Sequence, residues 1–249
     1  LTPLFEELIR KSLVSTCVDL SRYILKAVRR ILKHKLIKTN TALGYLVLSI
    51  PLTFSLTRCS LTRRKDRNDT INIRKCLIAE LTPCLKRSSG SLFYEALREA
   101  SPKYLGRFIG IIPDVSNNLS NTNDFDLYTI LKYSSYWDIN SKEVIEGYPL
   151  TFKIATKIFE ICEYMSPQCL MRLKQIHSEL ATQVIDSELV RSFGLTFNLI
   201  LQNIILASSS ESLIKSWLRS TNVNFGSISD LLAASILTYL WFKELRIFK

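Results

Sequence analysis

One short polar segment of the sequence combines residue types that can bind an anion. It runs from Asn222 to Asp230 and leads into an apolar stretch, Leu231 to Phe242, that is typical of a buried helix. The polar N-terminal turn of such a helix can hold an anion or a metal-bound phosphate, and an ordinary helix cap is the alternative. The segment offers residues for a turn with an unusual backbone angle, for a cap and for an acidic first turn: Asn224, Gly226, Ser227, Ser229 and Asp230.

A phosphate site in this chain must be built without a glycine-rich loop. Neither Gly-x-Gly-x-x-Gly nor Gly-x-x-x-x-Gly-Lys occurs, which disfavours a Rossmann site and a P-loop. Arg, Lys, helix N-termini and a metal must then hold any phosphate. Four of the seven glycines fall in polar turns or at helix starts, as expected for a site built from several helix ends: Gly44, Gly106, Gly147 and Gly226.

The net charge favours acidic partners. Thirty-three Lys and Arg against 22 Asp and Glu leave +11, which suits nucleotide phosphates, nucleic acid or an anionic membrane surface. The basic runs at 26–38 and 58–74 either border a phosphate site or are solvated faces. No apolar run is long enough to predict a membrane span, and no signal-peptide pattern is present. The chain opens at Leu1 without a Met, so it need not include its natural N-terminus.

The cysteines and histidines show no catalytic or metal-binding spacing. Six cysteines, at positions 17, 59, 76, 84, 162 and 169, include no Cys-x-x-Cys pair and no zinc pattern. We therefore predict reduced, structural thiols in a cytoplasmic protein. His34 and His177 lack neighbours that would make them ligands or triad bases, and each is expected to be solvated or satisfied by a local partner.

Hydrophobic periodicity predicts an all-α fold. Apolar residues recur at helical spacing and no sustained two-residue alternation occurs, so we expect a single multi-helix domain over residues 1–249, with buried central helices and polar turns at helix N-termini. The predicted helices cover 4–35 as one helix or two, 40 to a stop or kink near Pro51, 73–81 before a break at Pro83, 92–100, 127–135, 141–146, 149–164, 167–185, 188–206 and a last one from Ser229.

Several blocks of residues follow one another in a recognisable order. They are Asn40-Thr41-x-x-Gly44, Glu95 to Pro102 with Leu105-Gly106 and Asp114-Val115, Trp137-Asp138 leading to Gly147-Tyr148-Pro149, and Asn224-x-Gly226-Ser227-x-x-Asp230-Leu231. Their order and spacing resemble those of the triphosphoribosyl-dephospho-CoA synthase family, the CitG-like proteins. The last block is similar to the family's closing Asn-Pro-Gly-Thr-Thr-Ala-Asp-Leu. The resemblance covers about Asn40 to the end and agrees with an all-α fold.

The resemblance implies a cytoplasmic transferase with ATP and dephospho-CoA as substrates. Such an enzyme moves the triphosphoribosyl unit of ATP to a ribose hydroxyl of dephospho-CoA, or of a related acceptor, and releases adenine. The chemistry needs a metal, expected to be Mg²⁺, and cations on the triphosphate. It also needs a carboxylate near the sugar C1, where positive charge develops, and a group that activates the attacking hydroxyl.

The matched blocks imply specific residues for these roles. The catalytic carboxylates would be Asp114, Asp138 and Asp230, with Asp114 and Asp138 as the metal ligands. Helix capping is the alternative role of Asp138 and of Asp230. Nucleotide or phosphate binding would fall to Asn40, Thr41, Gly44, Arg172, Lys174, Asn224, Gly226 and Ser227.

The chain also departs from the family pattern. The segment from Pro167 to Lys174 lacks the Asp and the Gly that the family carries there, and Phe225 and Ile228 replace a Pro and a Thr of the closing motif. The chain therefore resembles a divergent member. Two other functions stay open, a non-catalytic relative that binds a nucleotide or a protein and a basic helical nucleic-acid-binding protein. The basic runs lack the interleaved aromatic residues of a stacking surface, which disfavours the last.

Overall fold

The computed structural model describes residues 1–33, 42–62, 70–101, 112, 125–162, 166–208, 216–218, 220–221 and 223–244. Within these ranges the regular elements are α-helices, and the β pairing there is an isolated bridge between Ser89 and Asp126. The prediction of a single all-α domain is thereby confirmed.

The described helices follow one another along the chain in one order. They are α1 (Thr2–Val14), α2 (Leu20–Leu32), α3 (Leu43–Thr62), α4 (Thr70–Arg87), α5 (Gly90–Ala100), α6 (Leu127–Ser134), α7 (Ile139–Ile145), α8 (Pro149–Ile161), α9 (Pro167–Gln183), α10 (Ser187–Phe193), α11 (Leu195–Ala207) and α13 (Gly226–Glu244). The first predicted helical region is thus two helices, and Asp19 caps the second by accepting a hydrogen bond from the Arg22 N–H.

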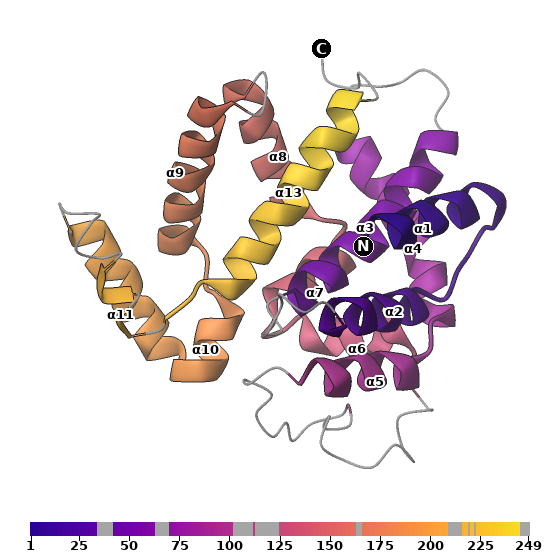
Figure 1. The fold of residues 1–249 in the computed structure, drawn as a ribbon, viewed down its shortest axis with the longest axis horizontal. Helices are drawn as coiled ribbons and strands as arrows, with labels where there is room; N and C mark the ends of the chain where they lie inside the picture. The colour runs from indigo at the N-terminus through magenta and orange to yellow at the C-terminus, as the bar shows by residue number, and fades with distance from the viewer. Residues whose placement is uncertain are drawn as a thin grey trace.

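Helix α13 lies between two groups of helices, as Figure 1 shows. One hydrophobic core is built mainly from α1 to α7 and includes Ala234 and Phe242 of α13. The second is built from α8 to α11 and includes Ile228, Leu231 and Tyr239 of the same helix. Because α13 has apolar residues on nearly every side, it can be buried in both cores at once. This confirms the predicted buried helix at the end of the chain.

The predicted break at Pro83 is wrong, and the helix predicted to stop or kink near Pro51 does not stop there. Helix α3 continues through Pro51 to Thr62, and α4 continues through Pro83 to Arg87. A proline inside a helix costs about 3 kcal/mol, because it removes one backbone hydrogen bond and crowds the preceding turn. In α3 nearly every side chain from Leu46 to Thr57 is buried, so packing on both sides of the proline offsets that cost.

Other helix boundaries differ from the sequence expectation in the second half of the chain. The helix predicted over 188–206 is divided at Gly194, which has φ +88° and separates α10 from α11. Helix α13 begins at Gly226, three residues before the predicted start, and Gly226 does not have a positive φ. Most of the loop predicted between 104 and 126 lies outside the described residues.

The cysteines are paired, so the prediction of reduced thiols is wrong for this structure. The disulfides join Cys17 to Cys84, Cys59 to Cys76 and Cys162 to Cys169. The paired cysteines are 67, 17 and 7 residues apart in the chain, and this spacing did not reveal the pairing. Because disulfides persist mainly in oxidising compartments, the cysteines give no support to the predicted cytoplasmic location.

No single described helix is long and apolar enough to cross a membrane. Helices α10 and α11 reach the necessary length and composition only as a pair, which is bent by 119°.

Candidate functional site

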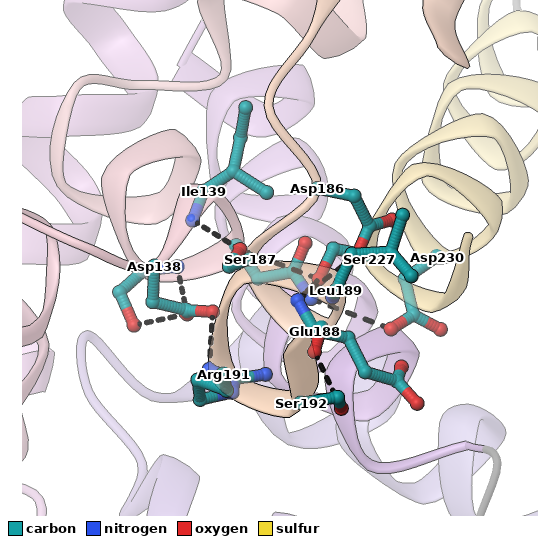
Figure 2. Close-up of polar contacts among 12 residues, drawn as sticks. Asp138, Ile139, Asp186, Ser187, Glu188, Leu189, Arg191, Ser192, Ser227 and Asp230 are labelled. Carbon is teal, nitrogen blue, oxygen red and sulfur yellow. Dashed lines mark hydrogen bonds and ion pairs between the residues drawn. The ribbon is translucent and has the colours of Figure 1, made fainter. Parts of the chain in front are cut away.

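The N-terminal ends of four helices meet in the middle of the molecule. They belong to α3, α7, α10 and α13, and Figure 2 shows the polar contacts around three of them. The Ile139 N–H at the start of α7 donates to the Ser187 hydroxyl at the start of α10, over 3.0 Å. At the start of α3, Gly44 lies directly against Asp230 of α13. Three of the matched sequence blocks are therefore brought together here, as expected for a site built from helix ends.

Asp186 joins two of these helix ends. Its Oδ1 accepts hydrogen bonds from the backbone N–H groups of Glu188 and Leu189 at the start of α10, at 2.9 and 3.0 Å. Its Oδ2 accepts the Ile228 N–H at the start of α13, at 3.0 Å. Burial raises the pKa of this fully buried carboxyl, and the three N–H donors oppose that rise. One side chain thus caps both α10 and α13.

Ser227 reinforces the same junction. Its buried hydroxyl accepts hydrogen bonds from the Glu188 N–H, at 3.2 Å, and from the Ser187 hydroxyl, at 3.3 Å. In this structure the Ser227 side chain therefore connects helix ends and is turned away from solvent (Figure 2). Its predicted role in binding phosphate stays a prediction.

Asp230 has the most perturbed acidity in the site. Burial raises the pKa of its carboxyl to about 8, and the negative charges of Glu188 and Asp138 add to the rise. Two donors oppose it, the Asn140 amide, whose Nδ2 lies 3.3 Å from Asp230 Oδ2, and the backbone N–H of Tyr45 in the first turn of α3. Asp230 is the fifth residue of α13, so it caps α3 and not its own helix.

The close approach of α3 to Asp230 explains Gly44. A β-carbon at this position would overlap the Asp230 carboxylate and the Asn140 amide. Asn140 is buried, and its Oδ1 has no hydrogen-bond partner among the described residues. A buried acceptor without a partner is uncommon, and a substrate hydroxyl would satisfy it.

Glu188 is a further acidic residue of the site, and it was missed in the sequence. Its carboxylate lies against Gly226, where a β-carbon would overlap it. Gly226 is therefore required for close approach and not for an unusual backbone angle. Burial, together with the charge of Asp186, raises the pKa of Glu188. Glu188 belongs to no matched block, and in the sequence it looks like any acidic residue at a helix start.

Asp138 caps α7, the alternative role that its sequence context allowed. Its Oδ2 accepts hydrogen bonds from the N–H and the hydroxyl of Ser141, at 2.9 and 2.8 Å. Its Oδ1 pairs with Arg191 of α10, 3.0 Å from Nη1. Both carboxylate oxygens therefore have partners within the protein, as Figure 2 shows. A catalytic role for Asp138 stays a prediction.

The described residues do not by themselves form a site for Mg²⁺. Among them, no three His, Cys, Asp or Glu side chains lie close enough to hold a metal ion. Asp138 and Asp186 are engaged in helix capping, which leaves Glu188 and Asp230. The other half of the predicted metal pair, Asp114, lies outside the described residues. The metal role of Asp114 and Asp138 thus stays a prediction.

The remaining predicted ligands lie at the edge of the site or outside the described residues. His177 of α9 contacts the Ser229 hydroxyl through Nε2, at 3.1 Å, and burial lowers its pKa, so this histidine is satisfied locally as predicted. Lys174, three residues before His177, is exposed on the same face of α9. Arg172 is rotated by roughly 140° from His177 around the helix axis. Asn224 is exposed just before α13. Asn40 and Thr41 lie outside the described residues.

Comparisons with known proteins give a family and a similar fold. A family described as ATP:dephospho-CoA triphosphoribosyl transferase, CitG, matches residues 1–247. The fold is similar to a crystal structure from Archaeoglobus fulgidus that carries a provisional assignment as a triphosphoribosyl-dephospho-CoA synthase. The TM-score is 0.68 at 18% sequence identity, over 96% of this chain and 94% of that chain. No curated protein matches the chain. The family match spans nearly the whole sequence, and the chain therefore belongs to the CitG family of ATP:dephospho-CoA triphosphoribosyl transferases.

Proposed function

We propose that the protein transfers the triphosphoribosyl unit of ATP to a ribose hydroxyl of dephospho-CoA at the junction of α3, α7, α10 and α13. In this reaction the hydroxyl oxygen of the acceptor bonds to C1′ of the ATP ribose. The bond between C1′ and the adenine nitrogen breaks, and adenine leaves with the electron pair and takes up one proton. The proton of the hydroxyl must pass to a base. The family match and the convergence of its sequence blocks at one place support this proposal.

The raised pKa of Asp230 is the observation that carries the assignment of the base. A general base is most efficient when its pKa lies near the working pH. Burial has raised the pKa of the Asp230 carboxyl to about 8. Asn140 and the Tyr45 N–H hold the carboxylate in one orientation. Asp230 would take the proton of the attacking hydroxyl, while Asn140 Oδ1 would accept a hydrogen bond from a second substrate hydroxyl.

Glu188 would supply the second carboxylate of the reaction. Positive charge develops on the ribose at C1′ as adenine leaves, and a fixed carboxylate nearby lowers the energy of that state. The Glu188 carboxylate receives no hydrogen bond from the part of the chain that the structure describes, in contrast to Asp186. It extends from α10 on the side of the junction where α13 carries Asp230 (Figure 2). Its charge is therefore free to act on a substrate.

The triphosphate needs positive charge, and exposed Lys174 would supply part of it. It shares a face of α9 with His177, which touches the first turn of α13. Exposed Asn224 lies at the same edge. Accompanying Mg²⁺ and a cytoplasmic location stay predictions. The two other functions that the sequence left open, a non-catalytic relative and a nucleic-acid-binding protein, gain no support from the fold or from the comparisons.

The test is the release of adenine. Purified protein is incubated with Mg-ATP, with dephospho-CoA and with both, and adenine is separated by chromatography. We expect adenine only when both substrates are present. Asp230→Asn should lower the rate by 10²-fold or more, a typical loss for a missing general base. Asp126→Asn, at the cap of α6, is the matched control and should retain the rate.

Two results would contradict the proposal in different ways. If the native chain binds neither substrate in a thermal-shift titration and releases no adenine, the transferase assignment fails. If adenine is released and Asp230→Asn retains the full rate, the reaction stands but the base is another residue.

A further inference from the structure

Helix α11 buries two polar residues on its inner side, beside the core residue Leu201, and exposes large apolar residues on its outer side. Its inner side buries Asn198 completely and Gln202 almost completely. Its outer side exposes large apolar residues, with Leu199 44% exposed, Ile200 54% and Ile204 47%. Monomeric soluble proteins seldom leave such a face open, so it marks an interaction surface.

The two buried polar residues of the inner side fix the orientation of α11 about its axis. Asn198 Oδ1 accepts the Asp186 N–H at 3.2 Å, and Gln202 Nε2 donates to the Val184 carbonyl at 2.8 Å. These bonds fix the segment that ends in Asp186, the residue that caps both α10 and α13. The orientation of α11 is therefore set from inside, and its outer face is left for a different contact.

The outer face has the shape of a helix-packing surface. At 3.6 residues per turn, one exposed row contains Leu195, Leu199 and Leu206, and a second contains Ile200 and Ile204. The row between them consists of smaller residues: Thr196, Asn203 and Ala207. Asn203 already donates its amide to the Leu199 carbonyl at 2.9 Å. Two apolar ridges with a groove between them suit a second helix of the same kind.

The size and charge of this face indicate what covers it. Together with Phe193, the large side chains are each about half exposed and present roughly 500 Å² of apolar surface, against about 800 Å² per partner in a standard interface. The helix contains no charged residue in a chain of net charge +11, so two copies could meet here without repulsion between facing charges. A helix that lies on a membrane is usually rich in Lys and Arg on its polar face, and α11 has none.

We propose that the outer face of α11 binds the same face of a second copy, forming a two-fold symmetric dimer with the two helices antiparallel. In a two-fold interface each surface contacts its own equivalent, so an apolar, uncharged face with ridges and a groove is complementary to itself. Helix α11 lies at the outer edge of the molecule, away from α1 to α7, so a second copy can reach it (Figure 1). The inference is independent of the reaction.

The test is the mass of the full chain in solution. Sedimentation over a range of concentrations should give twice the chain mass of 28.6 kDa. Ile200→Glu places one unpaired charge from each copy in the interface and should raise the dissociation constant by roughly 100-fold or more. Because Ile200 is exposed in one copy, the variant should keep its helical circular dichroism. Leu13→Glu, at a residue 47% exposed on α1, is the matched control and should remain dimeric.

Three outcomes would overturn the dimer. The native chain could sediment as a monomer at every concentration, or Ile200→Glu could remain dimeric. The native monomer could instead bind phosphatidylcholine vesicles through this face. If Ile200→Glu fails to fold, Asn203→Cys provides a second test, because the six natural cysteines are paired. A bismaleimide should then join two Asn203→Cys chains in solution, and failure to do so would equally refute the proposal.

Discussion

Replacing Asp230 with Asn should stabilise the protein at high pH while it removes activity. The ordinary pKa of an aspartate carboxyl is 3.8, and burial raises the pKa of Asp230 to about 8 in the folded chain. Between these values the unfolded chain has lost the proton and the folded chain keeps it. Rising pH therefore weakens the fold across this window, and above about 8 the full cost of a buried charge is present. An asparagine is neutral throughout and avoids that cost.

The size of the effect follows from the shift. One pKa unit corresponds to about 1.4 kcal/mol, so the two units between pH 6 and 8 correspond to about 3 kcal/mol. The free energy of unfolding of Asp230→Asn, minus that of the native chain, should grow by about this amount between pH 6 and 9. The isosteric amide keeps the shape of the carboxyl, and its oxygen can still accept the hydrogen bond from Asn140 Nδ2, so the packing against Gly44 is preserved.

Urea denaturation followed by circular dichroism at several pH values between 5.5 and 9 measures this difference. Asp126→Asn, which caps α6, should show no such growth over that range. A difference between Asp230→Asn and the native chain that stays constant from pH 6 to 9 would show that Asp230 is ionised throughout. The assignment of Asp230 as a base with a pKa near 8 would then be refuted.

Three further predictions follow from the same junction. The value of kcat/KM should rise tenfold per pH unit below about 8 and level off above it, because the free enzyme must lose the Asp230 proton; a profile flat from pH 6 to 9 would contradict this. Gly44→Ala should cost about 1–3 kcal/mol of stability through overlap with Asp230 and Asn140, and less in an Asp230→Ala background, where the overlap with Asn140 remains, as a double-mutant cycle by urea denaturation can measure. Asp186→Ala should cost about 2–4 kcal/mol, because two helices lose their cap, whereas Asp126→Ala, which uncaps one, should cost about 1; equal losses would argue against the shared cap.

The fold was largely predictable because helical periodicity is a local property. The apolar spacing located most helices, including the buried last helix. The errors occurred where tertiary packing decides the outcome. Helices α3 and α4 pass through Pro51 and Pro83, and Gly194 divides what looked like one helix. The disulfides were also missed, because separations of 67, 17 and 7 residues do not by themselves indicate pairing.

The site could be predicted only in part. Gly44, Gly226 and Asp230 come from matched blocks and lie close together in the structure, while their roles stay predictions. The blocks did not show that Gly226 accommodates Glu188, because contact between two helix starts is invisible in a single sequence. Asp186 and Glu188 were missed for the same reason. Sequence alone presents them as the cap and first turn of one helix, with no sign of the second helix that Asp186 also caps.

The shared cap has a consequence for how the site opens and closes. The backbone amides of Glu188, Leu189 and Ile228 donate to one carboxylate, although they come from segments about 40 residues apart in the chain. Any motion that withdraws Asp186 frees all three amides together. In hydrogen–deuterium exchange they should therefore lose protection as one unit, and α10 and α13 should fray at the same moment. The junction would then assemble or come apart as a whole.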